Sequence, residues 1–146
     1  MLDGARQRWV RSGEVELCVA ELGDPLHPTI VLVHGYPDSK EVWSEVAARL
    51  ADRFHVVLYD VRGHGRSTAP SPLWGGFTLE KLTDDFLAVA DAVSPDRPVH
   101  LVGHDWGSVQ SYGSSSRSSG PRAASRPSPR CPDRLSTISG TGSTHA

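Results

Sequence analysis

The sequence predicts an α/β fold for residues 1–110, in which a β-hairpin precedes a parallel βαβαβ sheet. Two observations carry this prediction. First, three short apolar runs rich in β-branched residues, typical of strands covered on both faces of a parallel sheet, occupy residues 29–33, 54–59 and 99–102. Second, two segments with helical spacing of apolar residues separate these runs. Strands that alternate with helices form sheets with helical crossovers, so the order is hairpin, strand, helix, strand, helix, strand.

The predicted hairpin opens the chain. Residues 15–20 alternate, with Val15, Leu17 and Val19 on one face and Glu16, Cys18 and Ala20 on the other, which predicts a half-buried strand. A turn at Arg11-Ser12-Gly13 would join it to a short strand from Gln7 to Val10.

Each helical segment has a start signal and an apolar stripe. The first begins at Asp38 or Ser39, and its stripe consists of Val42, Trp43, Val46, Ala47 and Leu50. The second is capped by Thr78 and ends before Pro95, with a stripe of Leu79, Leu82, Phe86, Ala90 and Val93.

The composition changes at Ser111. Residues 111–146 are dominated by serine, arginine, proline and glycine, and too few apolar residues remain to offset the entropy of ordering. We therefore divide the chain into a partial α/β domain, residues 1–110, and a disordered tail, residues 111–146. The tail is locally basic, which fits a nucleic-acid or membrane-surface arm. A random reading of a GC-rich gene explains the same composition, and we favour it.

Length and charge exclude several classes of protein. The 146 residues carry a formal net charge of −2, so the whole chain shows no sign of a nucleic-acid partner. Cys18 and Cys131 lack metal-ligand spacing, and no apolar run approaches the roughly 20 residues that cross a bilayer. We expect a cytoplasmic protein with no membrane partner, no metal and no cofactor; its oligomeric state stays open.

The stretch Gly103-His104-Asp105-Trp106-Gly107 carries the strongest functional signal. It has the spacing of a nucleophile elbow, a sharp strand-to-helix turn between glycines, with aspartate in the central position. A carboxylate is ionised at neutral pH and needs no base to attack an sp³ carbon, which would give an alkyl-enzyme ester. An ordinary helix cap is the alternative interpretation of Asp105.

Two further loops follow the other buried strands: His34-Gly35-Tyr36-Pro37 and residues 59–67. Loops after strands are where open α/β sheets place their ligands. We expect structural roles for several side chains in and near these loops. His34 would brace its loop, His104 would pack into the fold, Asp60, Arg62 and His64 would hold the second loop together, and Trp43 and Trp74 would pack in the core or on the surface.

Together these three loops resemble the α/β-hydrolase superfamily, in the epoxide hydrolase and haloalkane dehalogenase branch that uses aspartate. The resemblance covers about Gln7 to Gln110. It implies that Asp105 is the nucleophile, that the backbone N–H groups of Tyr36 and Trp106 form an oxyanion hole, and that Pro37 matches a cis-proline. The supporting loop residues are then His34, Gly35, Pro37, Gly103, His104 and Gly107. The implied substrate is a small epoxide or related apolar electrophile.

The resemblance stops before the parts that complete turnover. The family places an acid, a helical cap and a distant histidine after the nucleophile, whereas this chain offers only Asp133, His145 and Tyr112, none on a recognisable strand end. We therefore expect an inactive, truncated form, produced by a frame change in the gene. Residues 99–102 would be left as a bare apolar strand edge, although Leu135–Gly140 resembles the next strand of the family.

Two alternatives remain open. The chain could be a non-catalytic fragment or a basic-tailed binding module. It could also belong with the haloalkane dehalogenases; Tyr36 favours the epoxide hydrolase side, because dehalogenases often place asparagine there, whereas Trp106 is compatible with either.

Overall fold

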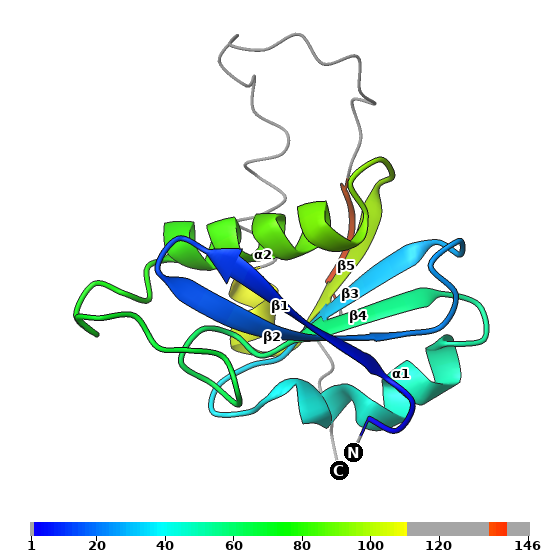
Figure 1. Ribbon diagram of the computed structural model, residues 1–146, viewed down its shortest axis with the longest axis horizontal. Helices are drawn as coiled ribbons and strands as arrows, with labels where there is room; N and C mark the ends of the chain where they lie inside the picture. Colours follow the sequence, from blue (N-terminus) through cyan, green and yellow to red (C-terminus); the bar gives the residue numbers. More distant parts are fainter. Residues whose placement is uncertain (1, 111–134, 140–146) are drawn as a thin grey trace, which may run out of the picture.

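The computed structural model describes residues 2–110 and 135–139 (Figure 1). Within these residues, six strands form one sheet in the order β1-β2-β4-β3-β5-β6. The elements are β1 (Arg6–Ser12), β2 (Val15–Leu22), β3 (Thr29–Val33), the 3₁₀ helix η1 (Lys40–Trp43), α1 (Ser44–Leu50), β4 (His55–Tyr59), α2 (Leu79–Val93), β5 (Val99–Gly103) and β6 (Leu135–Ser139). The predicted α/β fold class is confirmed.

The hairpin forms as expected, with small differences at its turn and in its burial. β1 runs antiparallel to β2 and extends to Ser12, which pairs with Val15, so the chain reverses one residue later than predicted. Gly13 supplies the positive φ of 56° at this reversal. Cys18 and Ala20 are fully buried, so β2 is not half-exposed as its alternation predicts. It is an interior strand with β4 on its other side.

The centre of the sheet is parallel. β3 lies between β4 and β5 and pairs with both in parallel register. All residues of β3 and β4 are buried, which confirms the prediction from their continuous apolar runs.

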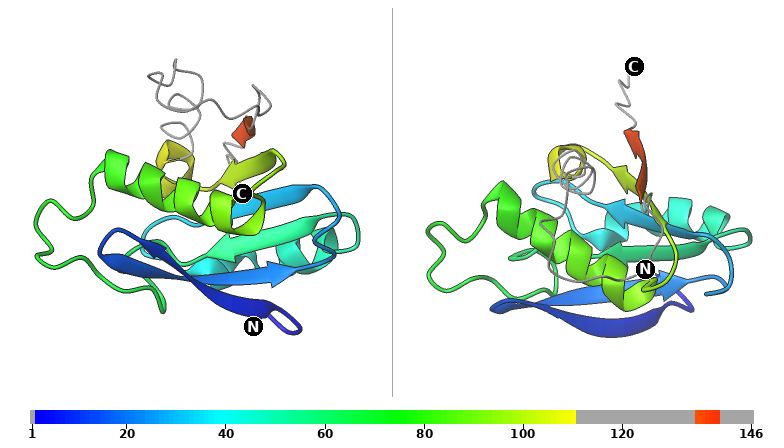
Figure 2. Two further views of the ribbon diagram at one scale, coloured as in Figure 1. Left: turned by 45° about the horizontal axis from the view of Figure 1, so that its top comes forward. Right: turned by 90° about the horizontal axis from the view of Figure 1, so that it is seen from above.

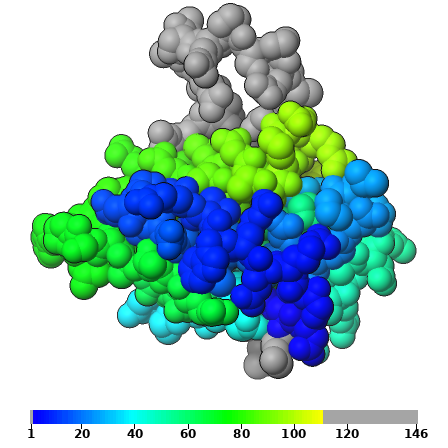
Figure 3. Space-filling model, in the orientation of Figure 1, coloured from blue at the N-terminus to red at the C-terminus, as the bar shows by residue number. Residues whose placement is uncertain are grey.

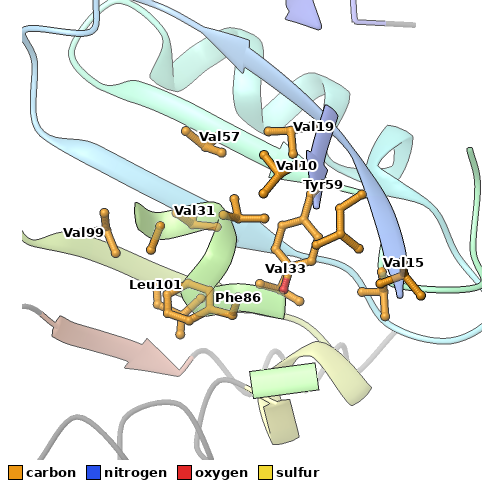
Figure 4. Close-up of a cluster of buried hydrophobic side chains, with 14 residues drawn as sticks. Val10, Val15, Val19, Val31, Val33, Val57, Tyr59, Phe86, Val99 and Leu101 are labelled. Atoms are coloured by element: carbon orange, nitrogen blue, oxygen red, sulfur yellow. The ribbon is translucent and has the colours of Figure 1, made fainter. Parts of the chain in front are cut away.

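Two apolar cores cover the two faces of this sheet, and Figure 1 shows α2 on one face and α1 on the other. On the α2 face, Phe86 and Val89 pack with strand residues such as Val31, Tyr59 and Leu101 (Figure 4). The core on the α1 face contains Ala20, Leu22, Ile30, Leu32, Ala47, Val56 and Leu58.

The second predicted helix is confirmed in its bounds and in its stripe except for Leu79, which is 45% exposed, and the first helix is confirmed only in part. α2 begins after Thr78, whose side chain accepts a hydrogen bond from the Lys81 N–H, and it ends before Pro95. The first segment is split into η1 and α1, and the side chain of Ser39 makes no capping hydrogen bond. Val42 and Val46 are 51% and 42% exposed, so these two members of the predicted apolar stripe are not buried in the core. The break between η1 and α1 changes the helical phase that the prediction assumes.

A sixth strand corrects the expectation of a bare sheet edge. β6 pairs in parallel with β5, from Val99 opposite Leu135 to Gly103 opposite Ser139 (Figure 2). β5 therefore has a neighbour on each side. Residues 135–139 fall within the predicted disordered tail, but they form this strand because their backbone completes the β5 hydrogen bonds. The rest of the tail, 111–134 and 140–146, lies outside the described residues.

The segment between β4 and α2 projects beside the hairpin (Figures 1 and 3). It carries Trp74, which is 95% exposed, so the packing role that we expect for this side chain is wrong. None of the helices in the described part of the chain is long and apolar enough to span a bilayer.

Candidate active site

The three loops singled out in the sequence meet at one edge of the sheet. The last residues of the central strands are register neighbours: Val33 pairs with Tyr59 on one side and with Gly103 on the other. The next residues in each loop, His34, Asp60 and His104, therefore begin side by side at the carboxyl ends of parallel strands. This is the position where open α/β sheets bind ligands.

Asp105 occupies a sharp bend between β5 and the helical residues 106–110. Its φ of 56° makes it the one non-glycine residue with left-handed backbone in the ranges 2–110 and 135–139. This conformation costs of order 1–3 kcal/mol, so the surroundings must hold it. The bend is secured by hydrogen bonds from Gly107 N–H to His104 O (2.9 Å) and from Ser108 N–H to Asp105 O (2.9 Å).

Two glycines allow the bend to lie close to the end of β3. A Cβ on Gly107 would collide with Val33 O and would lie 2.8 Å from His34 O. A Cβ on Gly35 would lie 2.6 Å from Oδ2 of Asp105. Real Cβ atoms do not approach other atoms this closely, so both positions require glycine for space. The absence of a side chain at both glycines lets the loop after β3 and the bend after β5 pack directly against each other.

The two loops also carry the backbone N–H groups of Tyr36 and Trp106, of which Trp106 directly follows Asp105. The N–H groups of Tyr36 and Trp106 have no hydrogen-bond partner among the described residues. Tyr36 and Trp106 are 67% and 58% exposed, and Asp105 is exposed as well. Asp105 and the two residues whose N–H groups lack a partner among residues 2–110 and 135–139 are thus all exposed. The Tyr36–Pro37 peptide bond is cis.

His34 links the loop after β3 to the loop after β4. Its ring is fully buried, with Nδ1 2.7 Å from Gly35 O and Nε2 2.9 Å from the Val61 N. Burial lowers the pKa of His34, and the hydrogen bond to Gly35 O opposes that shift. The ring is accordingly neutral at pH 7 and makes two bonds within the protein.

Asp60 organises the loop after β4. It is fully buried, and its carboxylate accepts hydrogen bonds from Nζ and N of Lys40 (both 2.8 Å) and from Arg66 N–H (3.0 Å). Burial alone would raise the pKa of Asp60, but the Lys40 side chain and the backbone donors lower it below its ordinary value. Lys40 was not singled out in the sequence, because a lysine in a helical segment normally faces solvent.

Arg62 ties the same loop to α2. Its guanidinium makes a two-point ion pair with Asp85, through bonds of 2.7 and 2.6 Å, and donates to Gly76 O at 2.8 Å. The hydrogen bonds that Arg62 donates to the Asp85 carboxylate raise the pKa of Arg62. His64, which we also place among the structural residues, lies two positions further along this loop with Nδ1 3.0 Å from Arg62 O.

His104 differs from its expected position. It is exposed and does not point into the fold. The reason is the bend itself, which turns residues 104–106 outward. The ring still packs edge-to-face with Trp43, with centroids 6.3 Å apart.

The described ranges hold no group of three histidine, cysteine, aspartate or glutamate side chains that could bind a metal ion. Asp133, His145 and Tyr112, the residues considered as partners of Asp105, lie outside those ranges.

The sheet order and the bend define an α/β hydrolase-type protein. A family model described as the alpha/beta hydrolase fold matches residues 28–112, and the chain belongs to this family.

Similar proteins extend this result. Residues of the chain are 50% identical over 95 positions to a protein described as probable oxidoreductase EphD from Mycobacterium tuberculosis, covering 65% of the chain and 16% of that protein. Epoxide hydrolase A from the same organism is 38% identical over 104 residues, covering 70% of the chain and 32% of the relative. The chain thus spans a third or less of the length of these relatives.

A solved structure agrees with the sequence relatives. The crystal structure of epoxide hydrolase A from Mycobacterium thermoresistibile matches with a TM-score of 0.69 and 30% identity, over 75% of this chain and 34% of that one. The chain is therefore similar to the N-terminal part of epoxide hydrolases, as the sequence resemblance indicated.

Proposed function

We propose that Asp105 is the nucleophile of an epoxide-hydrolase-like reaction that forms an alkyl-enzyme ester. One observation carries this proposal: Asp105 has a left-handed backbone at a strand-to-helix bend, and its carboxylate lies against Gly35. Nothing in an ordinary helix cap requires that conformation, because capping aspartates have extended backbone.

The first step is displacement at a ring carbon. One Asp105 oxygen attacks an epoxide carbon, the bond from that carbon to the ring oxygen breaks, and the ring oxygen takes the electron pair and a proton from solvent. The product is a hydroxyalkyl ester of Asp105. The N–H groups of Tyr36 and Trp106 would hold the carboxyl oxygen that does not attack.

The second step would hydrolyse this ester. Water adds to the ester carbonyl carbon, a negative charge develops on the carbonyl oxygen, and the same two N–H groups would stabilise it. The water must lose its proton to a base, and among the described residues we assign none. This chain is therefore expected to stop at the ester, one equivalent per molecule.

Mass spectrometry tests the first step. The full chain is incubated with styrene oxide and digested, and Asp105→Asn is the matched control. We expect one added epoxide mass on the peptide that contains Asp105 and none in the control. An unmodified peptide, or equal modification of the control, would overturn the proposal and favour a non-catalytic fragment or a tail-dependent binding module.

A haloalkane dehalogenase is the second candidate. A fluoroacetate dehalogenase from Burkholderia sp. is 32% identical over 109 residues, covering 73% of this chain and 35% of the relative. The exposed indole of Trp106 next to Asp105 would suit a leaving halide. Release of one equivalent of fluoride from fluoroacetate, with no adduct from styrene oxide, would favour this candidate.

A further inference from the structure

His34 has only one arrangement of ring protons that satisfies its two contacts. The Val61 N–H can only donate, so Nε2 at 2.9 Å must be the acceptor. Gly35 O can only accept, so Nδ1 at 2.7 Å must carry the proton. The geometry therefore selects the neutral ring with its proton on Nδ1.

The Gly35 carbonyl belongs to the same peptide group as the Tyr36 N–H. This peptide is not among the two cis bonds of the described residues, and a trans peptide group is planar, so its C=O and N–H point in opposite directions. Gly35 O accepts from His34 Nδ1 and also from Asp38 N–H at 3.0 Å. The hydrogen bonds that hold the Gly35 carbonyl in place therefore also set the direction of the Tyr36 N–H.

We propose that His34 is a positioning residue for the Tyr36 N–H: its neutral ring clamps the Gly35–Tyr36 peptide to the loop after β4, and protonation of Nε2 releases the clamp. The inference rests on the proposed role of the Tyr36 N–H in holding an Asp105 oxygen. The clamp itself can be tested without any substrate.

Charged and titratable groups surround the ring from each loop that packs on it. His64 contributes from the loop after β4, with ring centroids 5.5 Å apart, and Asp60 lies at the start of that loop. Asp38 lies in the same loop as His34, and Asp105 reaches the neighbouring Gly35 from the bend. Burial of the ring lowers the pKa of His34, and His64 acts in the same direction; the bond to Gly35 O and the two carboxylates Asp60 and Asp38 oppose it. Acidification through this pKa places a proton on Nε2, and two N–H donors then face each other at Val61.

The ring protons and the Val61 amide are directly observable by NMR of the ¹⁵N-labelled full chain. At pH 7 we expect His34 to carry its proton on Nδ1 and the Val61 amide to be protected from exchange. Protection of Val61, corrected for intrinsic exchange, should fall about fivefold or more as Nε2 titrates, which is the loss of one hydrogen bond. A proton on Nε2 at pH 7, or equal Val61 protection before and after titration, would overturn the clamp.

Two variants separate the clamp from general stability. His34→Gln cannot titrate, so its Val61 protection should not change with pH, whereas His64→Gln keeps the clamp and should behave like the native chain. Circular dichroism verifies the fold at each pH. If His34→Gln does not fold, the proton position and the pH series of the native chain still decide the question.

The rate of Asp105 ester formation from styrene oxide links the clamp to the site. In the native chain and in His64→Gln this rate should fall as acidification protonates His34. In His34→Gln the rate should be lower at pH 7 and should lack the pH-dependent fall that follows the titration of His34. An equal pH profile in all three proteins would overturn the positioning role. Absence of an adduct in all three would contradict the proposed function and leave the NMR result to decide the clamp.

Discussion

The carboxylate of Asp105 lies against the α-carbon of Gly35, so closely that a Cβ at residue 35 would come within 2.6 Å of Oδ2 and 2.7 Å of the Asp105 Cβ. Asp105 follows β5 and Gly35 follows β3, and the contact depends on the parallel pairing of these strands. The bend and the loop that carries Tyr36 therefore form one unit.

Gly35→Ala should disrupt this unit. The added methyl group must displace the Asp105 side chain or the loop, and overpacking of this kind costs about 1–3 kcal/mol of stability. We expect ester formation at Asp105 to fall at least about tenfold, since a misplaced nucleophile loses its attack geometry. Mass spectrometry measures the rate, and urea unfolding measures the stability.

Gly13→Ala is the control for this change. Gly13 has a positive φ of 56°, and no atom lies within 4 Å of the place that an added methyl group would take, so alanine there strains the backbone far from the site. It should lower stability by about 1 kcal/mol and leave the rate of ester formation unchanged. Equal rates in both alanine variants would contradict the role of the Gly35–Asp105 contact.

Replacement of Asp105 should separate stability from reactivity. Asp105→Gly removes the left-handed strain, so it should be more stable than Asp105→Ala by about 1 kcal/mol. Both variants should lose the styrene oxide adduct completely. Chemical denaturation of the two proteins, side by side, measures the difference; an alanine variant as stable as the glycine variant would show that the bend is not strained.

The Lys40–Asp60 pair should stabilise the fold in a pH-dependent manner. The pKa of Asp60 is lowered in the folded protein, so its contribution is present above its unfolded value near 3.9 and is lost as the pH falls through the lower folded value. Lys40→Met leaves the buried carboxylate without its cation and should cost about 3–5 kcal/mol at pH 7.

The double variant Lys40→Met/Asp60→Asn tests the origin of that cost. It should recover part of the stability that Lys40→Met loses, because no buried charge remains without a partner. Urea unfolding at pH 7 compares the three proteins. A double variant that is no more stable than Lys40→Met would contradict the prediction.

Arg62→Lys should destabilise the loop after β4 although the charge is kept. Lysine cannot reproduce the two-point contact with Asp85 or the bond to Gly76 O, so we expect a loss of about 2 kcal/mol. Lys81→Met removes an exposed pair with Glu14, 3.9 Å apart, and should change stability by less than about 0.5 kcal/mol. Thermal unfolding followed by circular dichroism distinguishes the two, and similar shifts would contradict the structural role of Arg62.

The strands and helices are predicted from local sequence patterns. These predictions are correct where the pattern follows directly from burial or from helix capping. The apolar runs of β3 and β4 are fully buried, and α2 has the predicted cap and stop. Alternation misjudges β2, since Ala20 belongs to the core on the α1 face and Cys18 is fully buried as well. Helical spacing misjudges Val42 and Val46, because the segment changes from a 3₁₀ helix to an α-helix between them.

The succession of strands and helices and the glycine spacing around Asp105 follow from local sequence, because the period of buried residues and the chemistry of turns are properties of neighbouring residues. Only the folded chain shows that His34 binds Val61, that Lys40 pairs with Asp60 and that Arg62 pairs with Asp85. Each of these three contacts joins residues that lie 20 or more positions apart, and no local pattern records which distant groups the strand order will bring together.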